Sequence, residues 1–175
     1  PPDTSLATAA AATMTGTNRF QFIAFLRDTL DDRGVQPGPF YAALAHLDVP
    51  LWISGTYDRL LPASLNAYSI GTAADLPFLP SGPRMVVRLA GDLASPRGLM
   101  VIESDYAQLR EDATDRQGLV EYLRLALDHK LLLFLGYDPA SPDFALLLRH
   151  VLNRHFAGVS ARGFLVWERP TPPLF

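Results

Sequence analysis

Three short segments of the sequence place glycine and aspartate directly after an apolar run. They are Ser54–Asp58, Ala90–Asp92 and Gly136–Asp138. Glycine lets a ligand approach the backbone closely, aspartate can accept hydrogen bonds from ribose hydroxyls, and the start of a following helix favours phosphate. In an open α/β sheet, ligands bind where loops leave the carboxyl ends of the strands. The segments therefore indicate a nucleotide-type cleft, unless each glycine only forms a turn and each aspartate only caps the next helix.

Apolar runs that alternate with helical patterns must position these segments. Strands are predicted at 51–53, 85–90, 99–102, 131–135 and 163–167, and helices at 19–30, 40–47, 57–66, 104–112, 118–130 and from 141 onward. Residues 67–83 contain three prolines and are predicted to form a loop. The run 131–135 is apolar on both faces, as a central parallel strand must be. This alternation predicts an α/β fold with a mostly parallel sheet.

Aromatic residues mark the expected core. Phe22 falls on the buried stripe of the first helix, whereas Phe20 and Phe25 flank it and could instead form a contact surface. Core packing is the favoured interpretation for both, as it is for Trp52 and Trp167.

Composition excludes several classes of function. The chain has 15 Lys and Arg against 18 Asp and Glu, for a net charge of −3, so it lacks the basic field of a general nucleic-acid-binding protein. It has no cysteine, which excludes disulfides, a thiolate nucleophile and a cysteine-ligated zinc site. The four histidines lack zinc-site spacing, so no metal site is expected.

Long apolar runs and targeting signals are also lacking. No apolar run approaches the roughly 20 residues of a membrane span, and no signal peptide opens the sequence. We therefore expect a cytoplasmic protein without a membrane partner. Residues 1–18 are rich in Ala, Thr and Pro and are predicted to be a linker or lead-in to a domain at 19–175.

Three blocks of the sequence resemble the SIR2-like domains of many bacterial multidomain proteins, distant relatives of sirtuins. Residues 52–61 are similar to that family's strand, Thr-Thr-Asn-Tyr-Asp segment and helix. Residues 88–106 are similar to its Lys-Leu-His-Gly-Asp block with a later strand and Asp-Tyr pair. Residues 133–144 resemble its Phe-Leu-Gly-Tyr-Ser block, which leads through Asp-Pro-Asp-Phe into a leucine-rich helix. The resemblance covers roughly residues 45–168 and implies a Rossmann-like, three-layer α/β/α fold.

The sequence departs from the family pattern where the family performs chemistry. Thr56 stands in place of the family's asparagine, and Ala90 stands in place of its general-base histidine. Alanine has no titratable group, and loss of a general base typically costs 10²–10⁴ in rate. The family's Gly-Ala-Gly loop, which cradles the pyrophosphate, has no counterpart, because Thr15–Thr17 does not follow a predicted strand.

The resemblance therefore implies a cleft for NAD or ADP-ribose without catalytic residues. The residues expected to line it are Ser54, Gly55, Thr56, Asp58, Gly91, Asp92, Gly136, Tyr137 and Asp138. The favoured interpretation is a catalytically degenerate module for interaction or nucleotide sensing, working with other domains or subunits of a larger bacterial defence or signalling protein.

Two other interpretations stay open. The chain could belong to an NAD-consuming enzyme, a hydrolase or deacylase, whose Gly-rich loop lies outside this sequence. It could also be a structural partner with no ligand in the cleft.

Overall fold

The computed structural model shows an α/β fold in which every paired strand runs parallel to its neighbour. It describes residues 10–13, 18–30, 32–79, 84–95, 98–102, 104–105, 115–128, 130–140, 142–152 and 163–166. The elements are α2 (Arg19–Thr29), α3 (Pro39–Ala45), β1 (Leu51–Ser54), α4 (Leu60–Leu65), β2 (Tyr68–Ile70), the 3₁₀ helix η1 (Ala73–Phe78), β3 (Met85–Arg88), α6 (Asp115–Ala126), β4 (Leu132–Leu135), α7 (Pro142–His150) and β5 (Gly163–Val166).

Two parallel sheets organise these elements. One has the strand order β1-β3-β2, and the other pairs β4 with β5. β3 is the centre of the larger sheet, with Trp52 of β1 opposite Val86 and Ile53 opposite Val87. On its other side, Ile70 of β2 also lies opposite Val87.

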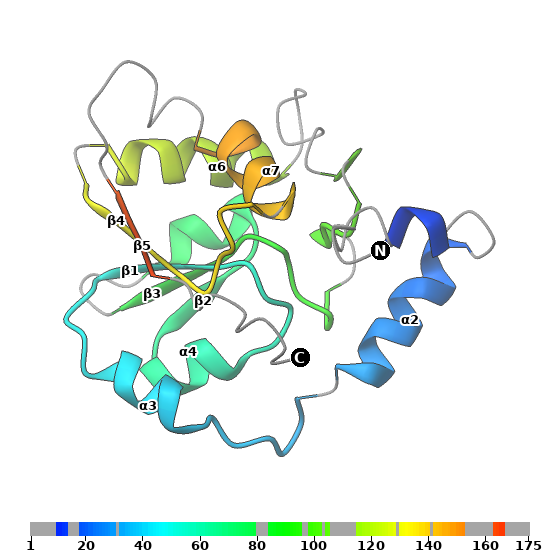
Figure 1. Ribbon diagram of the computed structural model, residues 1–175, viewed down its shortest axis with the longest axis horizontal. Coiled ribbons are helices and arrows are strands. Elements are labelled where there is room, and N and C mark those ends of the chain that lie inside the picture. The colour runs from blue at the N-terminus through cyan, green and yellow to red at the C-terminus, as the bar shows by residue number, and fades with distance from the viewer. Residues whose placement is uncertain are drawn as a thin grey trace, which may run out of the picture.

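Helices cover both faces of the larger sheet, which confirms the three-layer, Rossmann-like arrangement (Figure 1). Trp52 and Val86 pack against α3 and α4, whereas Val87 and Ile70 pack against α6 and α7 on the opposite face. The alternation follows from the strand period of two residues. It buries Val86 and Val87 completely, at 0% exposure, so β3 is packed on both faces.

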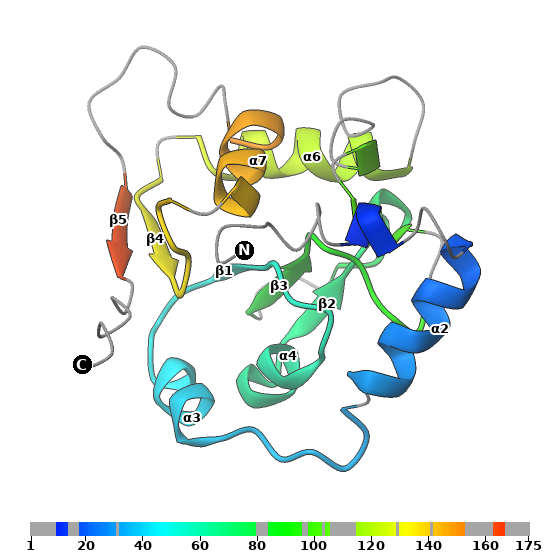
Figure 2. The same cartoon turned by 45° about the vertical axis from the view of Figure 1, so that its right-hand side comes forward.

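A third apolar cluster attaches α2 to the segment after β3. Phe22 and Ile23 of α2 pack against Leu99 and Val101, together with Ala10 of the helical turn 10–13. Both figures show α2 at the side of the layers rather than within one (Figure 2).

A polar contact adds to this attachment. Arg19 donates through Nη1 to both carboxylate oxygens of Asp105, and through Nη2 to the carbonyl of Leu99.

The prediction that residues 67–83 form a loop is wrong for most of its described part. Residues 68–70 form β2 and residues 73–78 form η1. β2 has three residues, two of them exposed, so it lacks an apolar run. The Thr72 and Asp75 capping box starts η1 despite Pro77 inside it.

The prediction of a strand at 99–102 is also wrong. Its apolar residues are buried, but the backbone N–H groups of Val101 and Ile102 donate to the Asp105 carboxylate instead of to a neighbouring strand. The Asp105 side chain thus accepts the backbone hydrogen bonds that a neighbouring strand would accept in a sheet. Burial of its apolar residues therefore does not make this segment a strand.

The run 131–135 forms β4 as predicted, but not as a central strand. Within the part of the chain that the structure describes, β4 pairs with β5 alone. Leu131 and Leu133 are 67% and 52% exposed. An apolar run shows that a strand is hydrophobic, but it does not fix how many strands flank it.

The predictions that aromatic residues lie in the core have different outcomes. Trp52 is in the core, at 9% exposure, but Phe20 and Phe25 are 81% and 60% exposed, so core packing is wrong for these two. Several predicted features lie outside the described residues: Trp167, Thr15–Thr17, the greater part of the predicted helix 104–112, and Ser141, the first residue of the last predicted helix. No helix in the described ranges is long and apolar enough to cross a membrane.

Candidate functional site

The end of β1 forms a tight polar turn. Ser54 is buried, at 6% exposure, and its hydroxyl lies 2.9 Å from the hydroxyl of Thr56 and 3.3 Å from the Thr56 backbone nitrogen, which donates to it. The Ser54 carbonyl accepts a hydrogen bond from the Leu89 backbone at the end of β3. Ser54 therefore ties the two strand ends together, while Gly55 and Thr56 are exposed beyond it.

The end of β3 is built around a buried arginine. Arg88 is 3% exposed; its Nη1 donates to the carboxylate of Asp92, and its Nη2 donates to the carbonyl of Tyr57, 2.9 Å away. Gly91 lies between the paired residues with φ +94°, a backbone conformation that glycine adopts without strain. Through Arg88, the β1 and β3 exits form one connected unit.

Tyr137 brings the β4 exit to the same place. A Cβ atom added to Gly55 would lie 2.4 Å from the Tyr137 hydroxyl oxygen, so this hydroxyl packs directly on the glycine backbone. The ring of Tyr137 is held from behind by Phe134 and Phe144, with ring centroids 6.4 and 5.3 Å away. The structure thus joins Gly55 and Tyr137, although β1 and β4 belong to different sheets.

The three aspartates share one local geometry. Asp58, Asp92 and Asp138 each accept a hydrogen bond from the backbone N–H two residues later, at 2.9, 2.8 and 2.9 Å. This Asx-turn bond stabilises the local backbone, and it is the turn-forming alternative expected from the sequence. Of these aspartates, Asp92 also carries a salt bridge, to Arg88.

Ala90, which the sequence resemblance places where the family has a histidine, is enclosed. Its residue is 2% exposed, and its carbonyl accepts a hydrogen bond from the Met100 backbone. The neighbouring segment is fixed further because the hydroxyl of Tyr57 donates to the carbonyl of Met100, at 2.6 Å. The position therefore offers neither a proton-transfer group nor open space at the surface.

Asp58 also influences a tyrosine on α3. Burial raises the pKa of the Tyr41 hydroxyl above its ordinary value, and the Asp58 carboxylate raises this pKa further. The carboxylate of Asp58 thus lies within electrostatic reach of α3 while it holds the turn before α4.

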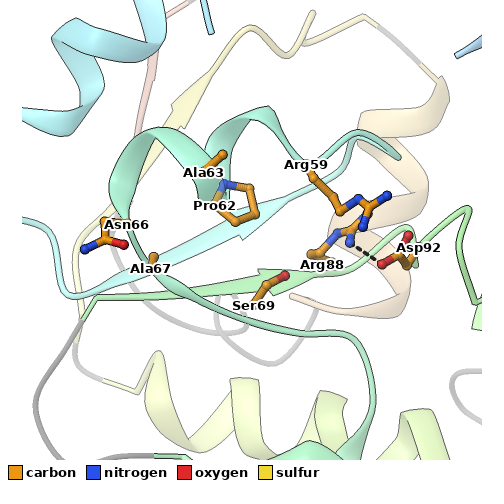
Figure 3. A pocket seen from close by; sticks show the side chains of 8 residues that line it. All are labelled: Arg59, Pro62, Ala63, Asn66, Ala67, Ser69, Arg88 and Asp92. Carbon is orange, nitrogen blue, oxygen red and sulfur yellow. Dashed lines mark hydrogen bonds and ion pairs between the residues drawn. The ribbon is translucent and has the colours of Figure 1, made fainter. Parts of the chain in front are cut away.

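A pocket lies beside this junction, between α4 and the strands β2 and β3 (Figure 3). Only Asp92 of the nine residues predicted from the sequence lines it, together with Arg88, Arg59 and residues of α4. Gly136 and Asp138 are exposed at the β4 exit, away from this lining. In the described ranges, no group of three or more His, Asp or Glu residues could hold a metal ion.

Sequence reasoning missed Arg88 and Arg59 as part of the site. Arg88 is the one charged residue in the apolar run 85–90. A charged residue in a predicted strand whose other residues are apolar could have indicated a buried polar site at the end of that strand. Arg59 follows Asp58 directly, but nothing in the local sequence shows that its side chain turns towards the end of β3 (Figure 3).

Comparison with known families finds a match. A model of the SIR2-like domain matches residues 51–173, which include β1 and all three strand exits. A search of curated proteins finds no match.

Proposed function

Because the chain belongs to the SIR2-like domain family, we propose that it is a catalytically degenerate member that binds a nucleotide of the NAD or ADP-ribose type and does not turn it over. The ligand would lie over the joined strand exits, against the backbone of Gly55 and the hydroxyls of Thr56 and Tyr137. The function of such a module is to sense the nucleotide for other domains or subunits of a larger protein.

The enclosure of Ala90 is the observation that carries the proposed loss of catalysis. A general base must lie within hydrogen-bond reach of the proton that it removes, and the residue at this position has no titratable group and is 2% exposed. The aspartates of the exits are engaged in turn-forming bonds. These bonds therefore support a structural role for the aspartates rather than a role as a replacement general acid or base.

The packing of Gly55 against Tyr137 supports retained binding. Gly55 is exposed, and the Tyr137 hydroxyl takes up the close approach that its missing Cβ allows. A ligand over the β1 exit would therefore meet the Gly55 main chain and the Tyr137 hydroxyl together. The exposed aromatic side chains of α2, Phe20 and Phe25, are candidates for contact with neighbouring domains.

Calorimetric titration with NAD and with ADP-ribose tests the proposed binding. We expect saturable heat with a stoichiometry of one site per chain for at least one of them. Thr56→Trp places a large side chain at an exposed position of the β1 exit and should abolish the heat. Thr29→Trp, at the exposed end of α2, is the matched control and should leave it unchanged. No heat with either nucleotide would contradict the proposal and favour a purely structural module.

A further inference from the structure

The pocket beside α4 adjoins the β3 exit, which contributes Arg88 and Asp92 to its lining, and has a volume of about 430 Å³. This is within the range of roughly 300–1,000 Å³ typical of small-molecule sites. Its lining consists of Arg59, Pro62, Ala63, Asn66, Ala67, Ser69, Arg88 and Asp92.

Two guanidinium groups from different elements meet at one end of this pocket. Figure 3 shows the side chain of Arg59, from the turn before α4, extending towards Arg88 at the end of β3. Arg88 is 3% exposed, and two of its groups donate to Asp92 and Tyr57. Its Nε is buried and has no hydrogen-bond partner among the described residues. An arginine carries five N–H donors, and these two bonds use one N–H each on Nη1 and Nη2, so both nitrogens retain a second donor.

The charge at this end favours an anion. Arg59 and Arg88 line the pocket with one carboxylate, that of Asp92. Outside the lining, Asp32 forms a salt bridge with Arg59, with Nε 4.0 Å from its carboxylate, and it also accepts the Arg59 backbone N–H. The Arg59 side chain is 53% exposed. With two guanidiniums and one carboxylate, the lining has a net charge of +1, which attracts an anion.

The rest of the pocket suits an uncharged group. Pro62, Ala63 and Ala67 form a wall of small apolar side chains. Asn66 adds an amide at the end away from the arginines, and Ser69 adds a hydroxyl closer to Arg88 (Figure 3). Asn66 is fixed in the left-handed conformation, with φ +46°, as the C-cap of α4. A free inorganic phosphate would leave this part of the pocket empty.

We infer that this pocket binds an organic phosphate monoester, with the phosphate on Arg59 and Arg88 and the uncharged remainder along Pro62, Ala63 and Ala67. Phosphate offers three oxygens to two guanidinium forks, whereas a carboxylate offers two. The inference does not depend on NAD binding at the strand exits, since Thr56 and Tyr137 do not line this pocket.

Titration with AMP, adenosine and inorganic phosphate tests this inference on the full chain. We expect AMP to bind, adenosine to bind at least tenfold more weakly because it lacks the phosphate, and inorganic phosphate to compete with AMP. Arg59→Gln should weaken AMP binding at least about tenfold, since it removes a charge-assisted contact. Arg27→Gln, at an exposed arginine of α2, is the matched control and should have no effect.

A second variant separates this pocket from the strand exits. Thr56→Trp should leave AMP binding unchanged, although it abolishes the binding of NAD or ADP-ribose proposed above. Loss of AMP binding in Thr56→Trp but not in Arg59→Gln would overturn the inference and place AMP at the strand exits. Equal affinity for AMP and adenosine, or no AMP binding at all, would overturn it as well.

Discussion

Arg88 and Asp92 form a salt bridge across the glycine turn that ends β3, with the arginine side chain 4% exposed and the aspartate side chain 28% exposed. The pair holds Gly91 in its turn, and the second guanidinium nitrogen of Arg88 fastens the β1 exit through the carbonyl of Tyr57. The aspartate that the family resemblance assigns to a nucleotide site is thus also the counter-charge of a buried arginine.

Removal of Asp92 should destabilise the protein far more than removal of Asp138. Both form the same turn-forming bond to a backbone N–H, but Asp92→Ala also leaves the charge of Arg88 buried without its partner. Because Asp92 is partly exposed, we expect a loss of about 2–4 kcal/mol in the free energy of unfolding, against about 0.5–1 kcal/mol for Asp138→Ala. Urea denaturation measures both. Equal losses of unfolding free energy in the two variants would show that the Arg88–Asp92 salt bridge does not stabilise the fold.

A double-mutant cycle tests the packing of Gly55 against Tyr137. Gly55→Ala should cost about 1–2 kcal/mol, since its Cβ would lie 2.4 Å from the Tyr137 hydroxyl oxygen and must displace the ring. Tyr137→Phe removes that oxygen and leaves the next ring atom at 3.5 Å, an ordinary contact. The double variant should therefore lose at least about 0.5 kcal/mol less than the sum of the single variants. Additive losses would contradict the contact.

Gly136 should be intolerant of a side chain for backbone reasons alone. It has φ +76° and nothing within 4 Å of an added Cβ atom, so Gly136→Ala should cost about 1–2 kcal/mol through strain of the left-handed conformation. Gly71 is equally open but has no such φ, and Gly71→Ala should change the stability by less than about 0.5 kcal/mol. Thermal and urea unfolding of the two variants gives the comparison, and equal effects would rule out strain as the cause.

Titration of Tyr41 tests the electrostatics around Asp58. Its pKa is raised above the ordinary value of 10.0, first by burial and then by the carboxylate of Asp58. Asp58→Asn should lower this pKa but leave it above 10.0, since burial is the larger cause. NMR of ring-labelled tyrosine measures the shift, with Tyr41→Phe to assign the signal. A rise of the pKa in Asp58→Asn would contradict the assignment.

The raised pKa of Tyr41 also sets the direction of an effect on stability. The folded protein favours the neutral phenol, so the contribution of Tyr41 is intact below about pH 10 and is lost as the pH rises through the folded-state pKa. Tyr41→Phe should accordingly reduce the alkaline loss of stability, as measured by urea unfolding across that pH range.

Much of the fold could be predicted from the sequence because strong local patterns agree with the final packing. The apolar run before Ser54 and the run 85–90 formed parallel neighbours as expected, and α6 buries its periodic face. The errors fall where tertiary contacts override the pattern. The segment 99–102 gives its backbone donors to Asp105 rather than to a strand, and a strand as short as β2 shows no periodicity.

The role of the nine predicted site residues stays a prediction, but the structure brings several of them together. The three exits do meet, through Arg88 and Tyr57 on one side and Tyr137 and Gly55 on the other. The pocket beside α4 was missed, since its residues come from a helix, an edge strand and the end of β3. Sequence spacing does not show which side chains of separate elements turn towards one space.

Release of nicotinamide from NAD is the most direct test of the proposed loss of catalysis. The purified chain is incubated with NAD, and free nicotinamide is quantified by chromatography against a protein-free sample. With Ala90 enclosed where a general base would be needed, we predict no release above the protein-free rate. Nicotinamide that forms in proportion to protein concentration, and no longer forms with Thr56→Trp, would show that the strand exits are catalytic and would contradict the proposal.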